Sequence, residues 1–168
     1  MSGALRAGGM ALVHPSHDLR DAWLDCRIEW GPGLHEDGFG LTEDDDVDSA
    51  QGFSDWIDRI RSDSDCTYRW MVEGRRVVGG IAVRHGSAAE IERLGHLGYG
   101  VRPSDRGRGV ATQALVDMLE VASEIGLSEL TAVCEVDNRA SVATLEGAGG
   151  ELLDRHGATV RYRIRFAR

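Results

Sequence analysis

The chain has 168 residues, with 19 basic residues that are all arginine and 28 acidic ones, giving a formal net charge of −9 at pH 7. This charge disfavours nucleic acid and anionic membranes as partners, because both require a basic footprint, and no apolar run approaches the ~20 residues that span a bilayer. Three scattered cysteines without Cys-x-x-Cys spacing argue against a disulfide framework and a zinc site, so we expect a cytoplasmic, metal-free protein.

The first part of the chain predicts a flexible leader over residues 1–9, followed by a single domain over 10–168. A strand is expected at 10–14 and a helix at 16–30. The stretch 31–49 combines glycines with seven carboxylates and is most simply a solvated, mobile loop. Apolar residues at helical spacing, Phe53, Trp56, Ile57 and Ile60, then predict a second helix that ends near 61.

The remaining periodicity predicts six strands and two helices. In chain order they are strands 68–73, 77–84 and 92–102, a helix 110–125, a strand 130–136, a helix 139–146, and strands 151–155 and 160–166. The polar stretch 86–90 is expected to link two antiparallel strands, and the strand at 130–136 to run parallel to 92–102 after a crossover. This order predicts an α+β fold in α/β/α layers, with a mixed, mostly antiparallel sheet of about six to seven strands and helices on both faces.

A glycine pair, Gly107 and Gly109, lies among arginines just before the helix at 110–125. Free N–H groups at a helix start attract anions, and glycine lets the backbone approach phosphate oxygens closely. The loop therefore predicts a phosphate site, although a tight turn alone explains such a pair. A dinucleotide fingerprint is excluded because Thr112 stands where its third glycine is required, and a P-loop is excluded because the chain has no lysine.

The segment Arg106-Gly107-Arg108-Gly109-Val110-Ala111 resembles the acyl-CoA pyrophosphate loop of the GNAT superfamily of N-acetyltransferases, Gln/Arg-x-x-Gly-x-Gly/Ala. A second segment resembles the family's Asn-x-x-Ser/Ala…Glu-x-x-Gly motif, with Asn138, Ser141, Glu146 and Gly149-Gly150. The amino-acid sequence at 84–85 and 95–103 is similar to that of a bacterial branch of predicted acetyltransferases. The resemblance covers about 76–155 and implies a GNAT-like fold with acetyl-CoA as co-substrate.

The resemblance also implies where the cofactor is held. Strands 92–102 and 130–136 would splay apart and free backbone N–H groups for the pantetheine and the thioester oxygen, in the manner of an oxyanion site. The implied cofactor-binding residues are Val101, Arg106, Gly107, Arg108, Gly109, Val110, Ala111, Thr112, Asn138 and Ser141.

Acyl transfer to an amine requires a general base, because an alkylamine with a pKa of about 10 is protonated at pH 7. The candidates are His96 and Glu135, and Glu92 is a third. A role as an ordinary half-buried strand residue is the competing interpretation of His96. Many GNAT enzymes protonate the leaving thiolate with a tyrosine where this chain has Leu145. Tyr99 is the candidate replacement, Tyr162 is a second, and water is the alternative.

We therefore predict an N-acetyltransferase that transfers the acetyl group of acetyl-CoA to a primary amine of a small molecule or protein by direct attack. A catalytically silent acyl-CoA-binding sensor or interaction module on the same scaffold is the alternative. The resemblance places the stretch 31–49 beside the acceptor, where an acidic lid would favour a cationic small molecule. A monomer and a homodimer both remain open.

Overall fold

The computed structural model describes residues 9–167, so the predicted leader lies outside the described residues except for Gly9. Its elements are β1 (Met10–Val13), η1 (His17–Leu19), α1 (Arg20–Trp30), α2 (Ala50–Arg61), β2 (Cys66–Glu73), β3 (Arg76–Arg84), α3 (Ala88–Leu94), β4 (Leu97–Val101), η2 (Pro103–Asp105), α4 (Val110–Glu124), β5 (Glu129–Glu135), α5 (Arg139–Gly147), β6 (Glu151–His156) and β7 (Thr159–Arg165).

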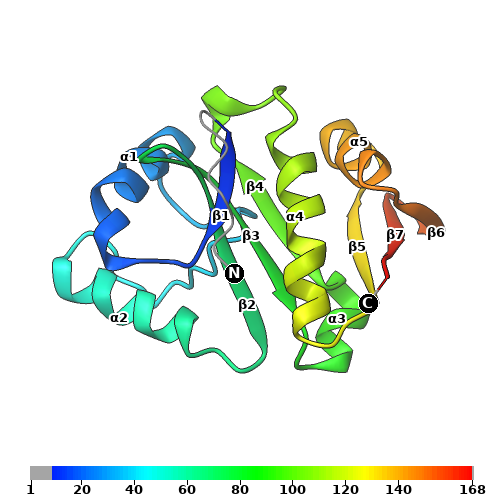
Figure 1. Cartoon of the computed structure of the whole chain (residues 1–168), viewed down its shortest axis with the longest axis horizontal. Helices are drawn as coiled ribbons and strands as arrows, with labels where there is room; N and C mark the ends of the chain where they lie inside the picture. Colours follow the sequence, from blue (N-terminus) through cyan, green and yellow to red (C-terminus); the bar gives the residue numbers. More distant parts are fainter. Residues whose placement is uncertain (1–8, 168) are drawn as a thin grey trace.

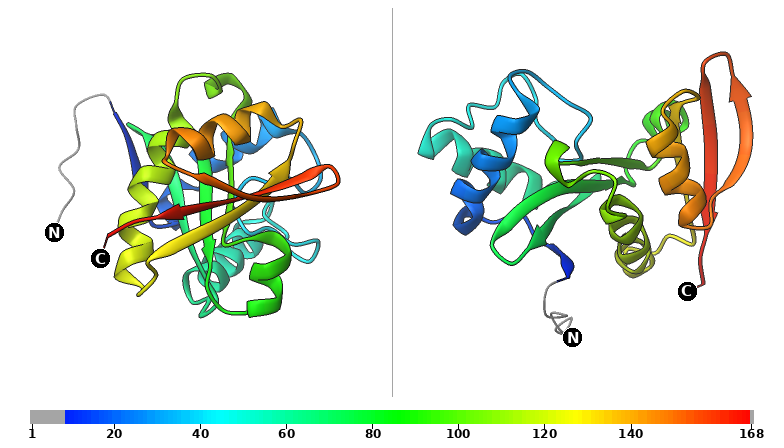
Figure 2. Two further views of the ribbon diagram at one scale, coloured as in Figure 1. Left: turned by 90° about the vertical axis from the view of Figure 1, so that its right-hand side faces the viewer. Right: turned by 90° about the horizontal axis from the view of Figure 1, so that it is seen from above.

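The strands form two antiparallel sheets, one in the order β1-β2-β3-β4 and one in the order β5-β7-β6. β4 and β5 run in the same direction, with α4 lying across the space between them (Figure 1). Seen from above, α1 and α2 cover one side of the larger sheet, and α4 separates it from the smaller sheet (Figure 2). The predicted α+β class with seven strands and helices on both faces is confirmed.

The junction of the two sheets is short. Within residues 9–167, the one isolated bridge joins Gly95 to Ala132, and the His96 N–H donates to Thr131 O at 2.8 Å. β4 and β5 then diverge instead of forming the extended parallel ladder that a continuous sheet would have. The divergence leaves backbone groups of both strands free to meet a ligand.

Residues 88–94 correct the sequence prediction, because they form α3 instead of a polar link and the start of a strand. The Ser87 hydroxyl caps the helix by accepting from the Glu90 N–H at 3.3 Å, and Gly95 ends it with a φ of 76°. Seven residues hold too few apolar positions to show helical periodicity. As a result, the strand begins at Leu97 and not at 92.

Two hydrophobic cores hold the layers together. The larger core fills the space between α4 and the two sheets, and the second, aromatic core lies under α1 and α2. In the aromatic core Trp23 and Trp56 have ring centroids 4.6 Å apart, and Phe39 is only 1% exposed. Since Phe39 belongs to the stretch 31–49, this stretch is anchored to the core and is not simply a solvated loop.

The carboxylates of the same stretch serve the fold. Asp45 forms an ion pair with Arg59 of α2, and Asp46 accepts from the Ser49 N–H just before α2 begins. None of the residues 42–49 lines the main cleft described below. These contacts of the acidic part of the stretch stabilise the start of α2.

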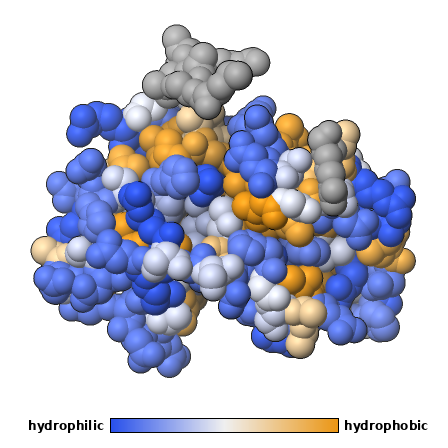
Figure 3. Space-filling model, turned by 60° about the horizontal axis from the view of Figure 1, so that its bottom comes forward, coloured by the Kyte–Doolittle hydropathy of each residue, from blue (hydrophilic) through white to orange (hydrophobic). Residues whose placement is uncertain are grey.

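The outer surface is mostly hydrophilic. On the face shown in Figure 3, hydrophilic side chains predominate and hydrophobic ones gather in separate small patches. On β7, Val160, Tyr162 and Ile164 are buried, and the arginines that alternate with them are more exposed. No helix formed by residues 9–167 is both long and apolar enough to cross a membrane.

Candidate functional site

A cleft of about 1070 Å³ opens where β4 and β5 diverge. Its walls are β4, the end of β5, the first turn of α4, one side of α5, and the loop 35–41. Most of the residues implicated by sequence meet there. They are Tyr99, Val101, Arg106, Gly107, Gly109, Val110, Ala111, Thr112, Glu135, Asn138 and Ser141.

The register of β4 decides which backbone groups face this cleft. Arg102 donates its N–H to Val78 O at 2.7 Å, and Arg84 donates its N–H to His96 O at 2.7 Å. In an antiparallel pair, such bonded positions alternate with positions whose N–H and C=O groups point to the other side. The N–H groups of Tyr99 and Val101 consequently point away from β3, toward the opening.

The start of α4 supplies a second set of free donors. Gly107 and Gly109 both have φ of 75°, and a Cβ on either would meet nothing within 4 Å, so the loop is open to the cleft. No side chain caps the helix at Gly109. The exposed N–H groups and the helix dipole together favour an anion at this place.

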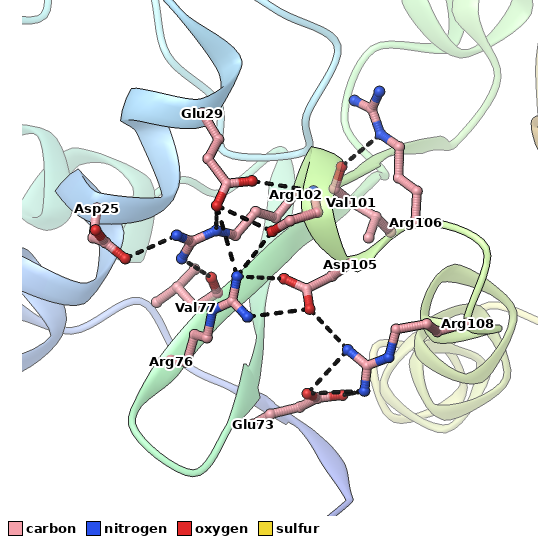
Figure 4. Close-up of polar contacts among 11 residues, drawn as sticks. Asp25, Glu29, Glu73, Arg76, Val77, Val101, Arg102, Asp105, Arg106 and Arg108 are labelled. Carbon is pink, nitrogen blue, oxygen red and sulfur yellow. Dashed lines mark hydrogen bonds and ion pairs between the residues drawn. The ribbon is translucent and has the colours of Figure 1, made fainter.

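Arg106 and Arg108 have different surroundings. Arg106 donates its Nε–H to Val101 O at 3.0 Å, and no carboxylate of residues 9–167 lies within ion-pair distance of its guanidinium. Arg108 instead pairs with Glu73 at 3.1 Å and Asp105 at 2.8 Å, and the Glu73 carboxylate raises its pKa. The side chain of Arg106 is thus free to reach a ligand, whereas that of Arg108 fastens the loop to β2 (Figure 4).

A network of ion pairs behind the loop joins it to α1. Arg102 is 5% exposed and pairs with Asp25 at 2.8 Å and Glu29 at 2.6 Å. Arg76 pairs with Asp105, which is 3% exposed, at 3.0 Å. Hydrogen bonds from Ser104 and Arg102 lower the pKa of Glu29 to about 2. The segment before Arg106 is therefore held in place from three sides (Figure 4).

Tyr99 and Ser141 connect the two walls of the cleft. The Tyr99 hydroxyl lies 2.6 Å from the Ser141 hydroxyl. Asn138 caps α5 by accepting the Ser141 N–H at 3.1 Å, which fixes the position of Ser141. Burial raises the pKa of Tyr99, so its hydroxyl stays protonated at neutral pH.

His96 lies apart from the other predicted site residues. Its Nδ1 accepts the Thr131 N–H at 2.9 Å and lies 3.0 Å from the Thr131 hydroxyl. Burial lowers the pKa of His96, which favours the neutral ring. Its side chain does not line the cleft, and it joins the strands at the point where they begin to diverge.

The usual acid position of the family is also outside the cleft. Leu145 is 0% exposed and belongs to the larger core. Tyr162 is buried too, and its hydroxyl donates to Glu146 at 2.9 Å. Neither residue lines the cleft, whereas Tyr99 on β4 and Tyr68 on β2 do.

The loop 35–41, part of the stretch 31–49 that the resemblance places beside the acceptor, forms the wall opposite β5. A Cβ on Gly100 would lie 2.7 Å from Asp37 Cα, and a Cβ on Gly80 would lie 2.7 Å from the ring of Phe39. The loop can rest on β3 and β4 only because these positions are glycine. Glycines inside strands often indicate the close approach of another backbone, and this signal was available in the sequence.

Several further cleft residues carry polar groups that sequence reasoning did not select. They are Cys66, Tyr68, Arg84, Arg93, Cys134 and Thr144. Among residues 9–167, no group of three His, Cys, Asp or Glu side chains is placed to hold a metal ion. The chemistry of the cleft therefore depends on carboxylates, arginines, hydroxyls and free backbone donors.

A family model described as an acetyltransferase (GNAT) domain matches residues 14–151. The chain belongs to the GNAT acetyltransferase family. The resemblance inferred from the two motifs is confirmed. No curated protein sequence matches the chain.

Solved structures of other GNAT acetyltransferases share the fold at low sequence identity. The microcin C7 self-immunity acetyltransferase MccE, in complex with acetyl-CoA and AMP, is 14% identical with a TM-score of 0.66, covering 94% of this chain and 92% of its own. A putative ribosomal-protein-serine acetyltransferase from Vibrio cholerae is 19% identical with a TM-score of 0.64, covering 93% of each chain. An acetyltransferase from Salmonella typhimurium that modifies the N-terminal serine of ribosomal protein L7/L12 is 14% identical with a TM-score of 0.66, covering 94% and 95%.

Proposed function

We propose that this GNAT protein transfers the acetyl group of acetyl-CoA to a primary amine of a small molecule or protein by direct attack. The observation that supports this most strongly is the cleft between β4 and β5, where free N–H groups of Tyr99 and Val101 adjoin the uncapped start of α4. A thioester carbonyl and a pyrophosphate need these two kinds of donor at two places along one groove.

The residues present fit a CoA molecule. Gly107 to Ala111 and the free guanidinium of Arg106 would hold the pyrophosphate, while Thr112, Asn138 and Ser141 would face the pantetheine arm. Arg108 would hold the loop in position through its ion pairs with Glu73 and Asp105. Bound in this way, acetyl-CoA supplies the activated acetyl group, and the chain supplies its orientation.

The transfer needs three actions from the chain. The Val101 N–H would stabilise negative charge on the carbonyl oxygen, and Glu135 would take a proton from the ammonium so that the amine nitrogen can attack. As the C–N bond forms and the C–S bond breaks, the Tyr99 hydroxyl would donate a proton to the thiolate, and the second proton lost by the acetylated nitrogen would restore that hydroxyl. Ser141 would hold this hydroxyl in place from α5. His96 is the second candidate base, with Nε2 as the nitrogen not bonded to Thr131.

A silent acyl-CoA-binding module is the second candidate function. It is favoured by one observation, the burial of Leu145 in the core, which leaves the family's usual acid position without a polar group. A protein of this kind would bind acetyl-CoA and release no thiol with any amine.

A screen of primary amines with acetyl-CoA distinguishes the two candidate functions. Thiol release and mass spectrometry of the acetylated amine are measured. We expect turnover with at least one class of acceptor, and its loss in Glu135→Gln with acetyl-CoA binding retained. Tight acetyl-CoA binding without turnover on any amine would instead support the sensor.

A further inference from the structure

Two arginines line the end of the cleft that lies away from the start of α4. Arg84 is the last residue of β3, and Arg93 lies in the last turn of α3. Arg84 donates from one terminal nitrogen to Gly95 O at 3.4 Å and Leu97 O at 3.2 Å. Within residues 9–167, neither arginine forms an ion pair, and the nearby Glu90 of α3 is not within ion-pair distance of either.

Structural contacts use only some of the hydrogen-bond donors of Arg84 and Arg93. The two carbonyl contacts of Arg84 hold the turn between α3 and β4, but they use one of its nitrogens. Guanidinium carries five N–H donors, so the rest remain for a ligand. The Arg93 side chain is exposed and makes no hydrogen bond with residues 9–167. Other arginines of residues 9–167 also lack carboxylate partners, but of these only Arg84, Arg93 and Arg106 line the cleft.

The other nitrogen of Arg84 lies over β4. A Cβ on Gly98 would be 3.1 Å from Arg84 Nη2, which places the guanidinium on the face of β4 to which Gly98 points. Gly100 points to the same face, because side chains alternate along a strand. Over Gly100 lies the loop 35–41, in contact through Glu36 and Asp37.

Along this face of β4, the positive charge of Arg84 lies over Gly98, and the loop that bears the carboxylate of Glu36 lies over Gly100. Two residues of a strand span about 7 Å, so the Arg84 guanidinium and the loop that bears the exposed Glu36 are separated by roughly that distance. Glu135 stands on the opposing wall beside the proposed point of transfer. An ammonium group fits between the carboxylates, and an anionic group fits at the arginines.

We propose that the acceptor is an amine that also carries an anionic group, a carboxylate or a phosphate, bound by Arg84 and Arg93. Guanidinium recognises both groups through paired, charge-assisted hydrogen bonds. The inference rests on the proposed acetyl transfer and narrows the acceptor from a simple cation to a zwitterion. Arg84 and Arg93 act as specificity residues that place the amine near Tyr99 and Glu135.

The test compares three series of primary amines of matched chain length: ω-aminocarboxylates with three to six carbons, ω-aminoalkyl phosphates, and n-alkylamines without an anionic group. We expect kcat/KM at least ~10-fold higher for an anionic series than for the alkylamines, because charge-assisted hydrogen bonds are lost in the latter. The better of the two anionic series identifies the group that is recognised.

Arg93→Gln should lower kcat/KM about 10-fold for the anionic series and leave alkylamine turnover unchanged. The Arg93 side chain is exposed and forms no hydrogen bond, so its replacement leaves folding intact. Arg84→Lys keeps the charge and should therefore lower kcat/KM for the anionic series less than Arg84→Gln does. Arg75→Gln, in the exposed turn between β2 and β3, is the matched control and should change neither series. Equal turnover of all three series, unaffected by Arg93→Gln, would overturn the inference while leaving acetyl transfer intact.

Binding of the same amines to the CoA-loaded protein, measured by calorimetry, separates the inference from the proposed function. If no amine is acetylated but anionic amines bind more tightly than alkylamines, and Arg93→Gln abolishes the difference, the arginine site stands and the enzymatic function fails. If the loaded protein shows no preference for anionic amines, the arginine site is refuted whatever the turnover.

Discussion

The hydroxyl of Tyr99 on β4 lies 2.6 Å from the hydroxyl of Ser141 on α5, across the cleft that separates the two sheets. The contact places a protonated phenol beside the expected position of the CoA sulfur, because burial raises the Tyr99 pKa. A thiol with a reference pKa of about 8.5 leaves more readily when such a group protonates it.

Tyr99→Phe should therefore lower kcat by about 10- to 100-fold, with the Kd for acetyl-CoA changed little. Ser141→Ala keeps the phenol and removes only its partner, so its effect should be smaller. Steady-state kinetics with a saturating acceptor check both variants. An unchanged kcat in Tyr99→Phe would leave protonation of the thiolate to water.

Glu135→Gln should lower kcat/KM for the acceptor by ~10²-fold, since the amide cannot take the ammonium proton. Glu135 lines the cleft, whereas His96 is bonded to Thr131 away from it. We accordingly expect His96→Gln to retain most of the activity per folded molecule. The opposite ranking of the two variants would make His96 the base.

His96 should instead affect stability and its dependence on pH. Losing the bond to the Thr131 N–H should lower the free energy of unfolding by about 1 kcal/mol in His96→Ala. Because the folded-state pKa lies below 6.5, folding favours the neutral ring, so its contribution is complete above pH 6.5 and is lost as the pH falls below that value. Denaturant unfolding between pH 7 and 5 should show a shallower pH dependence in the variant, with His14, whose pKa is also lowered, supplying the remainder. An identical slope would contradict this role.

Arg106 and Arg108 should differ although they flank the same glycine. Arg106→Gln should weaken acetyl-CoA binding about 10-fold at low salt and change thermal unfolding of the free protein only slightly, because it breaks no ion pair in the described part of the chain and loses only the hydrogen bond to Val101 O. Arg108→Gln should lower the melting temperature, since it leaves the buried Asp105 without one of its partners. Calorimetric titration and thermal scans of both variants give the comparison, and equal losses of affinity with no change in melting temperature would assign both arginines to the ligand.

The sequence was most informative where one short segment determines its own structure. The helix α4, the glycine loop before it and the helix α5, which Asn138 caps, follow from local spacing and capping preferences, and the three segments were predicted. The partners of Arg108 and His96 were not predictable in this way. Glu73 lies 35 residues before Arg108, and Thr131 lies 35 residues after His96, so only the folded sheet brings them together.

The acceptor side shows the same limit more strongly. The stretch 31–49 was placed beside the acceptor as a whole, whereas only its first part, 35–41, lines the cleft, where Phe39 anchors it to the core. Its position depends on the absence of side chains at Gly80 and Gly100, in strands far along the chain. Charge density alone did not identify the wall of the site, whereas the strand glycines mark the place where the loop approaches.

The crystal structure of the protein with CoA bound is the most direct test of the account as a whole. We expect the pyrophosphate against the N–H groups of Gly107 to Ala111 and the Arg106 guanidinium, and the thiol between Tyr99 and Val101 on one side and Ser141 on the other. A CoA molecule bound outside the opening between β4 and β5, or bound there with its thiol away from Tyr99 and Val101, would contradict the proposed site and the reaction built on it.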